Sequence, residues 1–389
     1  MWRYAIKRTL WFIPTLFAVT AIGFILLANA PGDPVNILVS SNSSSGSIKT
    51  SGDLEIQRTF WRKKLGLDLP LFYFSITKLS EPDTLYKVYD EKKLKEIKTK
   101  IALNGSYKNY IPKIVWYGFQ NQYHQWLFGG PNSKGIIRGD FGISYMKKEP
   151  VISILKDKLI WSVFFSVVSI LLAYAISIPI GMRMAEKPES KFTKFTQLTL
   201  FVLYSLPSFF VGVLLLMLFA NPDVLSIFPP SGIKPIEGYS DNASLLSKFI
   251  DSVPYMILPL ICYTYSSLAF ISRLTATSIN EQLRLDYIKT AKAKGLPDKK
   301  VLWKHALKNS ALPLITVFSS VFPAIIGGSV IIESIFSIPG MGLETVKAIV
   351  SQDYPIVIAV ITLSSILTIF SYLLADMLYA WVDPRIRTQ

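Results

Sequence analysis

Residues 159–182 read LIWSVFFSVVSILLAYAISIPIGM and contain no charged side chain. A helix needs about 20 predominantly apolar residues to cross a hydrocarbon core of about 30 Å, and this run is longer. The whole chain is biased in the same direction, because 51% of its 389 residues are hydrophobic and its mean hydropathy is +0.38. The run therefore predicts a membrane-spanning helix, and that prediction decides the class of fold.

Five more uncharged apolar stretches of similar length occur along the chain: residues 9–30, 195–220, 252–272, 311–332 and 355–375. Prolines inside several of them do not exclude a helix, since packed membrane helices tolerate proline, often as a kink. The sequence thus predicts an all-α polytopic membrane protein with six transmembrane helices.

The first stretch has a second interpretation. Arg3, Lys7 and Arg8 precede it, and Ala28-Asn29-Ala30 looks like the cleavage site of a secretory signal peptide. Its apolar run is longer than the roughly 7–15 residues of a usual signal core. We therefore favour a retained transmembrane anchor over residues 1–30.

The basic residues indicate how the spans are oriented. The N-terminal tail, the loops after the second and fourth spans and the C-terminal tail together hold 18 Lys and Arg, whereas the two short loops on the other side hold three. Lys and Arg accumulate in short cytoplasmic loops, while long loops translocate largely regardless of charge. Both termini are therefore expected in the cytoplasm, and residues 31–158 outside. This distribution explains the net charge of +15 better than nucleic-acid binding does.

Several kinds of chemistry have no support in the sequence. The single cysteine, Cys262, excludes an internal disulfide or a thiol metal site, and His124 and His305 belong to no HExxH pattern. The spans hold almost no ionisable groups, which ion-coupled carriers place near mid-membrane. There is no GxxxxGK[ST] phosphate loop. We expect no catalytic, metal or cofactor site, and we expect a cytoplasmic partner to supply the energy for any transport.

The segment 31–158 is expected to form a small mixed subdomain outside the membrane. Residues 40–47 are a Ser/Asn/Gly run typical of a flexible loop, and residues 83–103 carry apolar positions at helical spacing. Six aromatic residues follow and are expected to form a small core: Trp116, Tyr117, Phe119, Tyr123, Trp126 and Phe128.

The large loop 284–310 is the most informative stretch outside the spans. It predicts a short helix, a sharp turn and a second helix, because Gly295 suits a left-handed helix C-cap and Pro297 suits the first position of a helix. Asp298 then lies at a positive helix end. The product is a basic elbow. Local physics favours two roles equally, docking in a groove of another protein or lying on anionic lipid.

The loop resembles the coupling loop, or EAA motif, of binding-protein-dependent ABC importer permeases. DYIKTAKAKGLP at 286–297, followed by KHALKNSALPLI at 304–315, is similar to the dipeptide/oligopeptide family, in its B-type subunit. The family's Glu-Ala-Ala is replaced here by Lys289-Thr290-Ala291, and the motifs leave residues 74–114 as an insertion. Five further segments agree in order: APGDP at 30–34, LGLDLP at 65–70, GDFGIS at 139–144, ESIFSIPGMG at 333–342 and DMLYAWVDPRIR at 376–387.

The resemblance implies a type I ABC importer (MetI-like) permease fold over residues 159–382, followed by a cytoplasmic tail over 383–389. It implies a multi-pass protein of the bacterial plasma (inner) membrane, in contact with membrane lipid and not with nucleic acid. The implied partners are a second homologous permease, two cytoplasmic ATPase subunits, an external solute-binding protein and a peptide substrate.

The resemblance also suggests roles for individual residues. Contact with the ATPase is expected from six elbow residues: Asp286, Tyr287, Ala291, Gly295, Leu296 and Pro297. In that contact Ala291 and Gly295 would permit close approach, and Leu296 would insert as a knob. An external hairpin near the substrate gate is expected at Glu333, Ile338, Pro339, Gly340 and Gly342, with a plain tight turn as the alternative. The transport path could be lined by Tyr204, Tyr263 and Tyr265, for which helix packing is an equal alternative. Asp376, Asp383 and Arg385 are expected to fix the inner end of the last span.

Three other functions are compatible with parts of the sequence. A permease of the same superfamily for another solute, nickel or an oligosaccharide, shares these motifs, although nickel would favour histidines on the path and no span contains one. A membrane enzyme lacks a catalytic constellation. A scaffold or receptor would need only an anchor, whereas the motifs extend over spans two to six.

Overall fold

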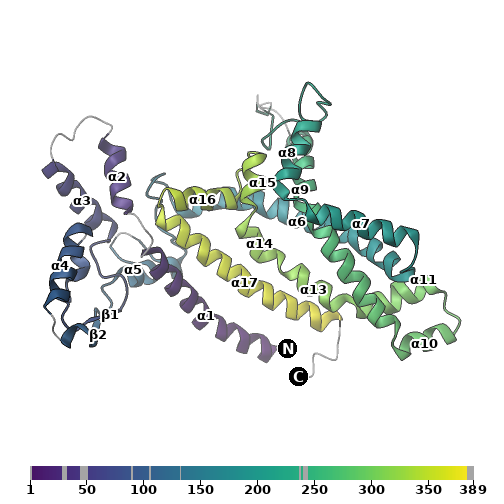
Figure 1. The fold of residues 1–389 in the computed structure, drawn as a ribbon, viewed down its shortest axis with the longest axis horizontal. Coiled ribbons are helices and arrows are strands. Elements are labelled where there is room, and N and C mark those ends of the chain that lie inside the picture. Colours follow the sequence, from purple (N-terminus) through teal and green to yellow (C-terminus); the bar gives the residue numbers. More distant parts are fainter. Residues whose placement is uncertain are drawn as a thin grey trace. The chain divides into compact units, whose positions relative to one another are not determined.

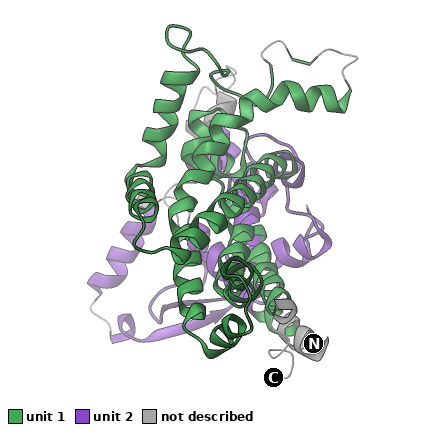
Figure 2. Cartoon of the chain, turned by 90° about the vertical axis from the view of Figure 1, so that its right-hand side faces the viewer, with its two compact units in different colours: residues 1–14, 156–346, 363–389 green, residues 15–155, 347–362 purple. Residues whose placement is uncertain are grey.

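The computed structural model describes residues 2–28, 33–43, 51–88, 91–104, 107–131, 133–235, 238–239 and 244–382. Over these residues the regular secondary structure is helical apart from one two-stranded antiparallel sheet. The chain divides into two compact units (Figure 2): Met1–Pro14, Lys156–Val346 and Leu363–Gln389 form unit 1, and Thr15–Leu155 and Lys347–Thr362 form unit 2.

Four helices are long and apolar enough to cross a membrane (Figure 1). They correspond to the predicted first, second, fourth and sixth spans: α1 Trp2–Ala28, α6 Val151–Glu186, α9 Leu245–Leu283 and α17 Tyr354–Val382. Residues 29–30 of the predicted first span lie outside the described residues. The 39 residues of α9 extend the helix well beyond the predicted span at both ends.

The predicted third span is not one straight helix. Helix α7 (Lys191–Ser205) and helix α8 (Ser208–Phe219) meet at an angle of 97°, and the corner is visible in Figure 1. Pro207 explains the break, because proline has no N–H for the helix ladder and pushes the preceding residue out of the α region. Leu206 is accordingly extended, with φ −81° and ψ 125°.

The predicted fifth span is also interrupted. It consists of α13 (Ala311–Ser319), α14 (Val321–Gly327) and α15 (Val330–Ile335), and its longest apolar part, Ala311–Ile325, is shorter than the spanning helices. Gly328 breaks the helix with φ +55°, a left-handed conformation that suits glycine. In the described part of the chain, four long helices and one bent pair therefore stand where six straight spans were predicted.

Helices α6 and α9 of unit 1 approach each other closely at one place. A Cβ on Gly181 of α6 would collide with the Ser272 carbonyl oxygen and the Thr275 side chain of α9. One turn earlier, the Ser177 hydroxyl donates to the Leu268 carbonyl across the same contact, at 3.2 Å. Small residues one turn apart are the usual means by which membrane helices approach closely.

The loop after α9 folds as predicted into a helix, a turn and a second helical segment. Helix α10 spans Asp286–Ala293. The second segment begins with α11 (Asp298–Lys300), continues as one π-helical stretch (Val301–Ala306) and ends with α12 (Leu307–Asn309).

A further short helix, α16 (Met341–Val350), follows α15 and precedes the last long helix α17.

In unit 2, α2 (Pro34–Ser43) and α3 (Ser51–Leu65) follow the first span. The strands β1 (Phe74–Lys78) and β2 (Pro112–Trp116) pair antiparallel, with Ile76 opposite Ile114. Helix α4 (Glu91–Leu103) lies between them in the sequence, and α5 (Gln122–Phe128) follows. Three short 3₁₀ turns complete the unit, at Leu85–Lys87, Tyr107–Asn109 and Ile136–Arg138.

Two local predictions for this unit need correction. Residues 40–43 of the predicted flexible loop are helical and end α2, while 44–47 lie outside the described residues. The six aromatic residues do not form a closed core. Tyr123 is fully buried, but Trp116, Phe119 and Phe128 are exposed, because this small unit has too few elements to cover them.

Candidate functional site

The elbow turn is closed by backbone hydrogen bonds at the end of α10. The Gly295 N–H donates to the Lys292 carbonyl at 2.9 Å, and the Leu296 N–H donates to the Ala291 carbonyl at 3.4 Å. This is the Schellman pattern, and Gly295 has the required positive φ, +75°. The predicted C-cap is confirmed. Pro297 is the N-cap of α11, one position earlier than predicted, and Asp298 is its first residue.

The elbow packs on the C-terminal ends of α6 and α9 through a buried apolar cluster. Helix α6 supplies Met182, Met184 and Ala185, and α9 supplies Ala276 and Ile279. The elbow contributes five buried residues: Ile288, Ala291, Val301, Leu302 and Ala306. A displacement of the elbow would therefore act directly on the ends of both long helices, since packed interiors transmit strain.

The six predicted contact residues differ in accessibility. Ala291 is only 6% exposed and lies within the chain's own cluster, where its small side chain allows the elbow to pack on the long helices. Leu296 is half-buried against the same cluster, which limits it as a free knob. Tyr287 is half-buried, and its hydroxyl donates to the Gln282 side chain at 2.8 Å. Asp286, Gly295 and Pro297 are exposed.

The exposed tip of the elbow is basic. Lys289 pairs with Asp286 at 2.8 Å, and Lys292 pairs with Asp298 at 3.0 Å. Three more lysines at the tip are exposed: Lys294, Lys299 and Lys300. Exposed ion pairs contribute little to the stability of a fold. The charges of this tip therefore stabilise the elbow only slightly and remain accessible to a binding partner.

The second cluster of interest surrounds Glu333, whose side chain is fully buried. One carboxyl oxygen faces the Ser162 and Tyr263 hydroxyls, each at 3.4 Å, and the Ser329 N–H at 3.3 Å. The other accepts a hydrogen bond from the Leu343 N–H at 2.7 Å. We call this set the Glu333 knot. It connects α6, α9 and the two ends of the predicted hairpin.

Three glycines enclose the carboxyl group. A Cβ at Gly328 or Gly340 would overlap the Glu333 carboxyl group, and one at Gly342 would press on it and on the Gly327 carbonyl. Within the predicted hairpin, the Ile338 N–H donates to the Glu333 carbonyl at 2.8 Å, and Ile338 itself is buried. Pro339 is half-buried. Three of the predicted hairpin residues, Ile338, Gly340 and Gly342, therefore contact a fourth, the buried acid Glu333.

Two helices link the elbow to the Glu333 knot. Helix α9 carries Tyr263 and, about 20 residues later, enters the elbow, a separation of about 30 Å at 1.5 Å per residue. Its prolines, Pro254 and Pro259, precede Tyr263, so the connecting part has no proline. Helix α6 carries both Ser162 and Met182. The two sites are thus joined by continuous helices within one unit.

The three predicted path tyrosines lie in different environments. Tyr265 is buried, and its hydroxyl donates to the Leu206 carbonyl at 2.8 Å, a group released by the break between α7 and α8. Tyr263 stacks on Phe165 and reaches Glu333. Tyr204 is 64% exposed at the end of α7. Tyr204 is thus the most exposed of the three and Tyr265 the most buried, and a role in lining the path stays a prediction.

Unit 2 contains a site that sequence reasoning missed, the buried carboxyl group of Asp353. It accepts hydrogen bonds from the Ser144 hydroxyl and from the N–H groups of Tyr145 (3.0 Å) and Met146 (3.3 Å). Burial, and then the nearby Asp353 carboxyl group, raise the pKa of Tyr145. The sequence shows both partners, the motif GDFGIS at 139–144 and an acid directly before the last span. No pattern in the sequence indicates that the two are in contact. Asp383 and Arg385 lie outside the described residues.

Comparison with known proteins gives a consistent result. Residues 177–388 match the family described as the binding-protein-dependent transport system inner membrane component. The chain is 30% identical to the oligopeptide transport system permease protein AppB of Bacillus subtilis, with 98% of each chain covered. It is 30% identical to the peptidoglycan transport system permease protein YejB of Agrobacterium fabrum, with 99% of this chain and 98% of the relative covered.

A third relative is the dipeptide transport system permease protein DppB of Escherichia coli, 29% identical with 100% of this chain and 99% of the relative covered. The matched profile covers more than half of the chain, including the elbow and every member of the Glu333 knot except Ser162. The chain therefore belongs to the family of inner membrane components of binding-protein-dependent transport systems.

Proposed function

We propose that this chain is the transmembrane permease subunit of an ATP-driven importer of dipeptides or oligopeptides. It would form the translocation path with a second, homologous permease. Two cytoplasmic ATPase subunits would supply the energy, and an external solute-binding protein would deliver the peptide. The observation that carries the proposal is the full-length similarity to permeases named for peptide transport, in a chain whose elbow is packed on two spanning helices.

The proposed topology has six crossings with both termini in the cytoplasm. The bent pair α7–α8 would be one crossing, and the interrupted series α13–α15 another. Irregular backbone is tolerated at membrane depth where it is covered by protein, and the hydrogen bond from Tyr265 to Leu206 supports such cover at the first break. The domain limits proposed from the sequence, 1–30, 31–158, 159–382 and 383–389, follow from this topology.

The proposed coupling step begins at the elbow. An ATPase groove would hold the exposed residues of the turn, among them Asp286, Gly295 and Pro297, with the lysine-rich tip as an electrostatic contact. Movement of the ATPase pair would shift the elbow, and the buried cluster would pass the shift to α6 and α9. Those helices would carry it to the Glu333 knot, which we propose as part of the external gate. The alternative, an elbow resting on anionic lipid, provides no such connection.

The proposal is tested by reconstituting the complete complex in proteoliposomes and supplying ATP inside the vesicles and binding protein outside. Uptake of labelled dipeptides and longer peptides is compared with uptake of nickel and of an oligosaccharide under the same conditions. We expect peptide uptake only. If nickel or the oligosaccharide is taken up and peptides are not, the proposed substrate is wrong, while the proposal that the chain is a permease subunit stands.

A further inference from the structure

The antiparallel strand pair β1–β2, a hairpin with a long connection and distinct from the predicted hairpin at residues 333–342, exposes its apolar face and covers its polar face. Along β1 and β2 the side chains alternate between covered and exposed, as expected for strands. The exposed face holds Phe74 opposite Trp116 and Ile76 opposite Ile114. Both isoleucines are 70% exposed, and Trp116 is 65% exposed. A hairpin in water normally turns such residues inward. We call these four side chains the hairpin face.

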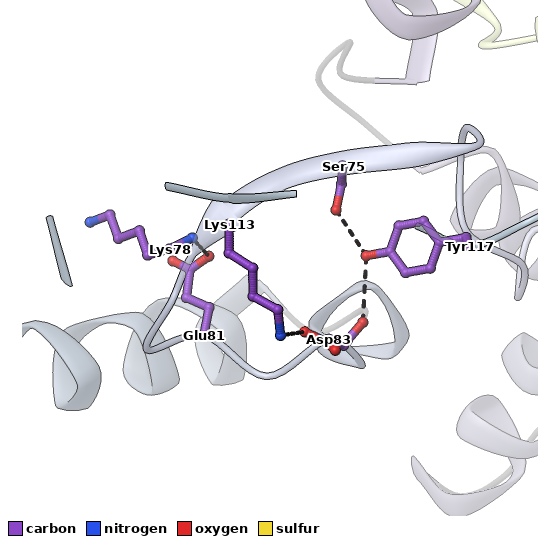
Figure 3. Close-up of polar contacts among 6 residues, drawn as sticks. All are labelled: Ser75, Lys78, Glu81, Asp83, Lys113 and Tyr117. Carbon is purple, nitrogen blue, oxygen red and sulfur yellow. Dashed lines mark hydrogen bonds and ion pairs between the residues drawn. The ribbon is translucent and has the colours of Figure 1, made fainter. Parts of the chain in front are cut away.

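The opposite, covered face of the same hairpin is largely polar (Figure 3). Ser75 shares a hydrogen bond of 2.9 Å with the Tyr117 hydroxyl, and Lys113 pairs with Asp83 at 2.7 Å. The Tyr117 hydroxyl also donates to the Asp83 carbonyl at 3.5 Å. These contacts fix which side of the hairpin faces the rest of the unit. A shift of one residue in the pairing register would exchange the two faces and bury the apolar residues, but it would break these polar contacts.

A chain of aromatic contacts connects the hairpin face to the first span. Trp116 stacks on Tyr73 with ring centroids 6.3 Å apart, and Tyr73 contacts Tyr123 at 6.1 Å. Tyr123 lies against Phe17 and Phe24 of α1, at 5.6 and 5.4 Å. Its hydroxyl is 2.9 Å from the Thr20 hydroxyl. All these residues belong to unit 2, so the hairpin face is tied to α1 within one compact unit.

The contact on α1 lies inside the stretch that crosses the membrane. The apolar window of α1 is Leu10–Leu27, and Thr20 is seven residues, or about 10 Å, from its end at Leu27. Where α1 crosses a bilayer over this window, Tyr123 packs against it below the edge of the hydrocarbon layer. The hairpin face is two aromatic contacts from Tyr123, so an interfacial depth is expected for it.

The residues in and around the hairpin face are of the types found at the membrane–water interface. Trp and Tyr are enriched at membrane interfaces, and Lys is favourable beside anionic lipid. Lys78 extends the exposed face of β1, and Tyr110, just before β2, is 88% exposed. The four side chains of the hairpin face are 43–70% exposed in the described part of the chain, and apolar groups left in water are unfavourable by about 25 cal/mol per Å².

We propose that the hairpin face is embedded in the interfacial layer of the outer leaflet and that its partner is lipid. This extends the proposed function, on which it rests through the crossing of α1 and the placement of residues 31–158 outside. The hairpin would hold the external unit against the membrane surface, close to the first span.

Site-directed spin labelling tests the proposal in the complete complex, reconstituted in vesicles of phosphatidylethanolamine and phosphatidylglycerol. Cys262 is buried and is the chain's only cysteine, so it can remain in place while single cysteines are introduced. Ile76→Cys and Ile114→Cys report on the hairpin face, and Thr77→Cys reports on the covered face. Leu26→Cys on α1 is the lipid reference, and Lys98→Cys on α4 is the water reference.

Labels at Ile76 and Ile114 should be accessible to oxygen and shielded from a water-soluble nickel chelate, like the label at Leu26. Labels at Thr77 and Lys98 should not show this lipid pattern. If the chelate reaches 76 and 114 as freely as 98, the proposal is wrong. Shielding that appears only after binding protein is added would assign the face to that protein and also overturn it. A water-exposed label at Leu26 would instead overturn the crossing of α1, and peptide uptake by the same vesicles reports separately on the proposed function.

Discussion

The carboxyl group of Glu333 collects donors from segments that are far apart in the sequence. Ser162 is 171 residues before it, and Leu343 is 10 residues after it. The motif ESIFSIPGMG drew attention to the hairpin, and Gly340 and Gly342 could be recognised there. No periodicity links this motif to Ser162, because their proximity follows from how α6 packs in the folded chain. Leaving any of these buried donors without an acceptor would cost about 1–3 kcal/mol.

Gly340→Ala tests whether the glycines must leave room for this acid. The added methyl group would overlap the Glu333 carboxyl group, and overpacking of this kind costs about 1–3 kcal/mol. We expect a lower thermal stability of the purified complex and reduced peptide uptake. The matched control is Gly327→Ala, where a Cβ meets nothing within 4 Å. Equal stability of the two variants would contradict the enclosed arrangement.

At the scale of elements, the elbow was predictable in outline and not in its packing. The order Gly295, Leu296, Pro297 is a local signal, and the Schellman turn confirms it. The burial of Ala291 depends on contacts with α6 and α9, which no local pattern encodes. The break at Pro207 was visible as a proline, but its 97° angle depends on tertiary contacts such as the hydrogen bond from Tyr265.

Gly295→Val tests the elbow as the coupling element. A Cβ at Gly295 meets nothing within 4 Å, so the cost is conformational, about 1–2 kcal/mol for a side chain in the left-handed region. We expect the turn to open, less ATPase to co-purify and uptake to fall.

Gly238→Val is the matched control for this change. Gly238 has φ +82° and equally open surroundings but lies in a loop far from the elbow in the sequence. Its variant should retain ATPase binding and uptake. A loss of the same size in both variants, or in neither, would show that the elbow has no special role.

At the scale of the whole molecule, composition was sufficient for the class of fold and charge for a proposed orientation. Long uncharged runs such as 159–182 correspond to long helices, because the bilayer imposes length and hydrophobicity. The reversed hairpin was not predictable, since Phe74, Ile76, Ile114 and Trp116 look like the buried side of a strand pair. Which side is covered depends on Tyr117 and Asp83 across the unit.

The proposed topology predicts the result of reporter fusions. A reporter active only in the cytoplasm should give signal when fused after Gln389 and none when inserted near Asp241, because 18 Lys and Arg lie on one side and three on the other. Immunoblotting confirms that both fusions are made in equal amounts. The opposite pattern would reverse the orientation, and with it the side on which the elbow lies.

The central claim, that ATP hydrolysis in partner subunits drives peptide through this permease, is tested most directly by uptake in proteoliposomes that contain the complete complex. Labelled peptide is supplied outside with binding protein, ATP is held constant inside, and a protonophore is added. Because the span interiors hold almost no ionisable groups to couple a proton, uptake should continue unchanged after uncoupling and should stop when ATP is removed. Uptake that stops on uncoupling at constant ATP, or that continues without ATP, would contradict the account.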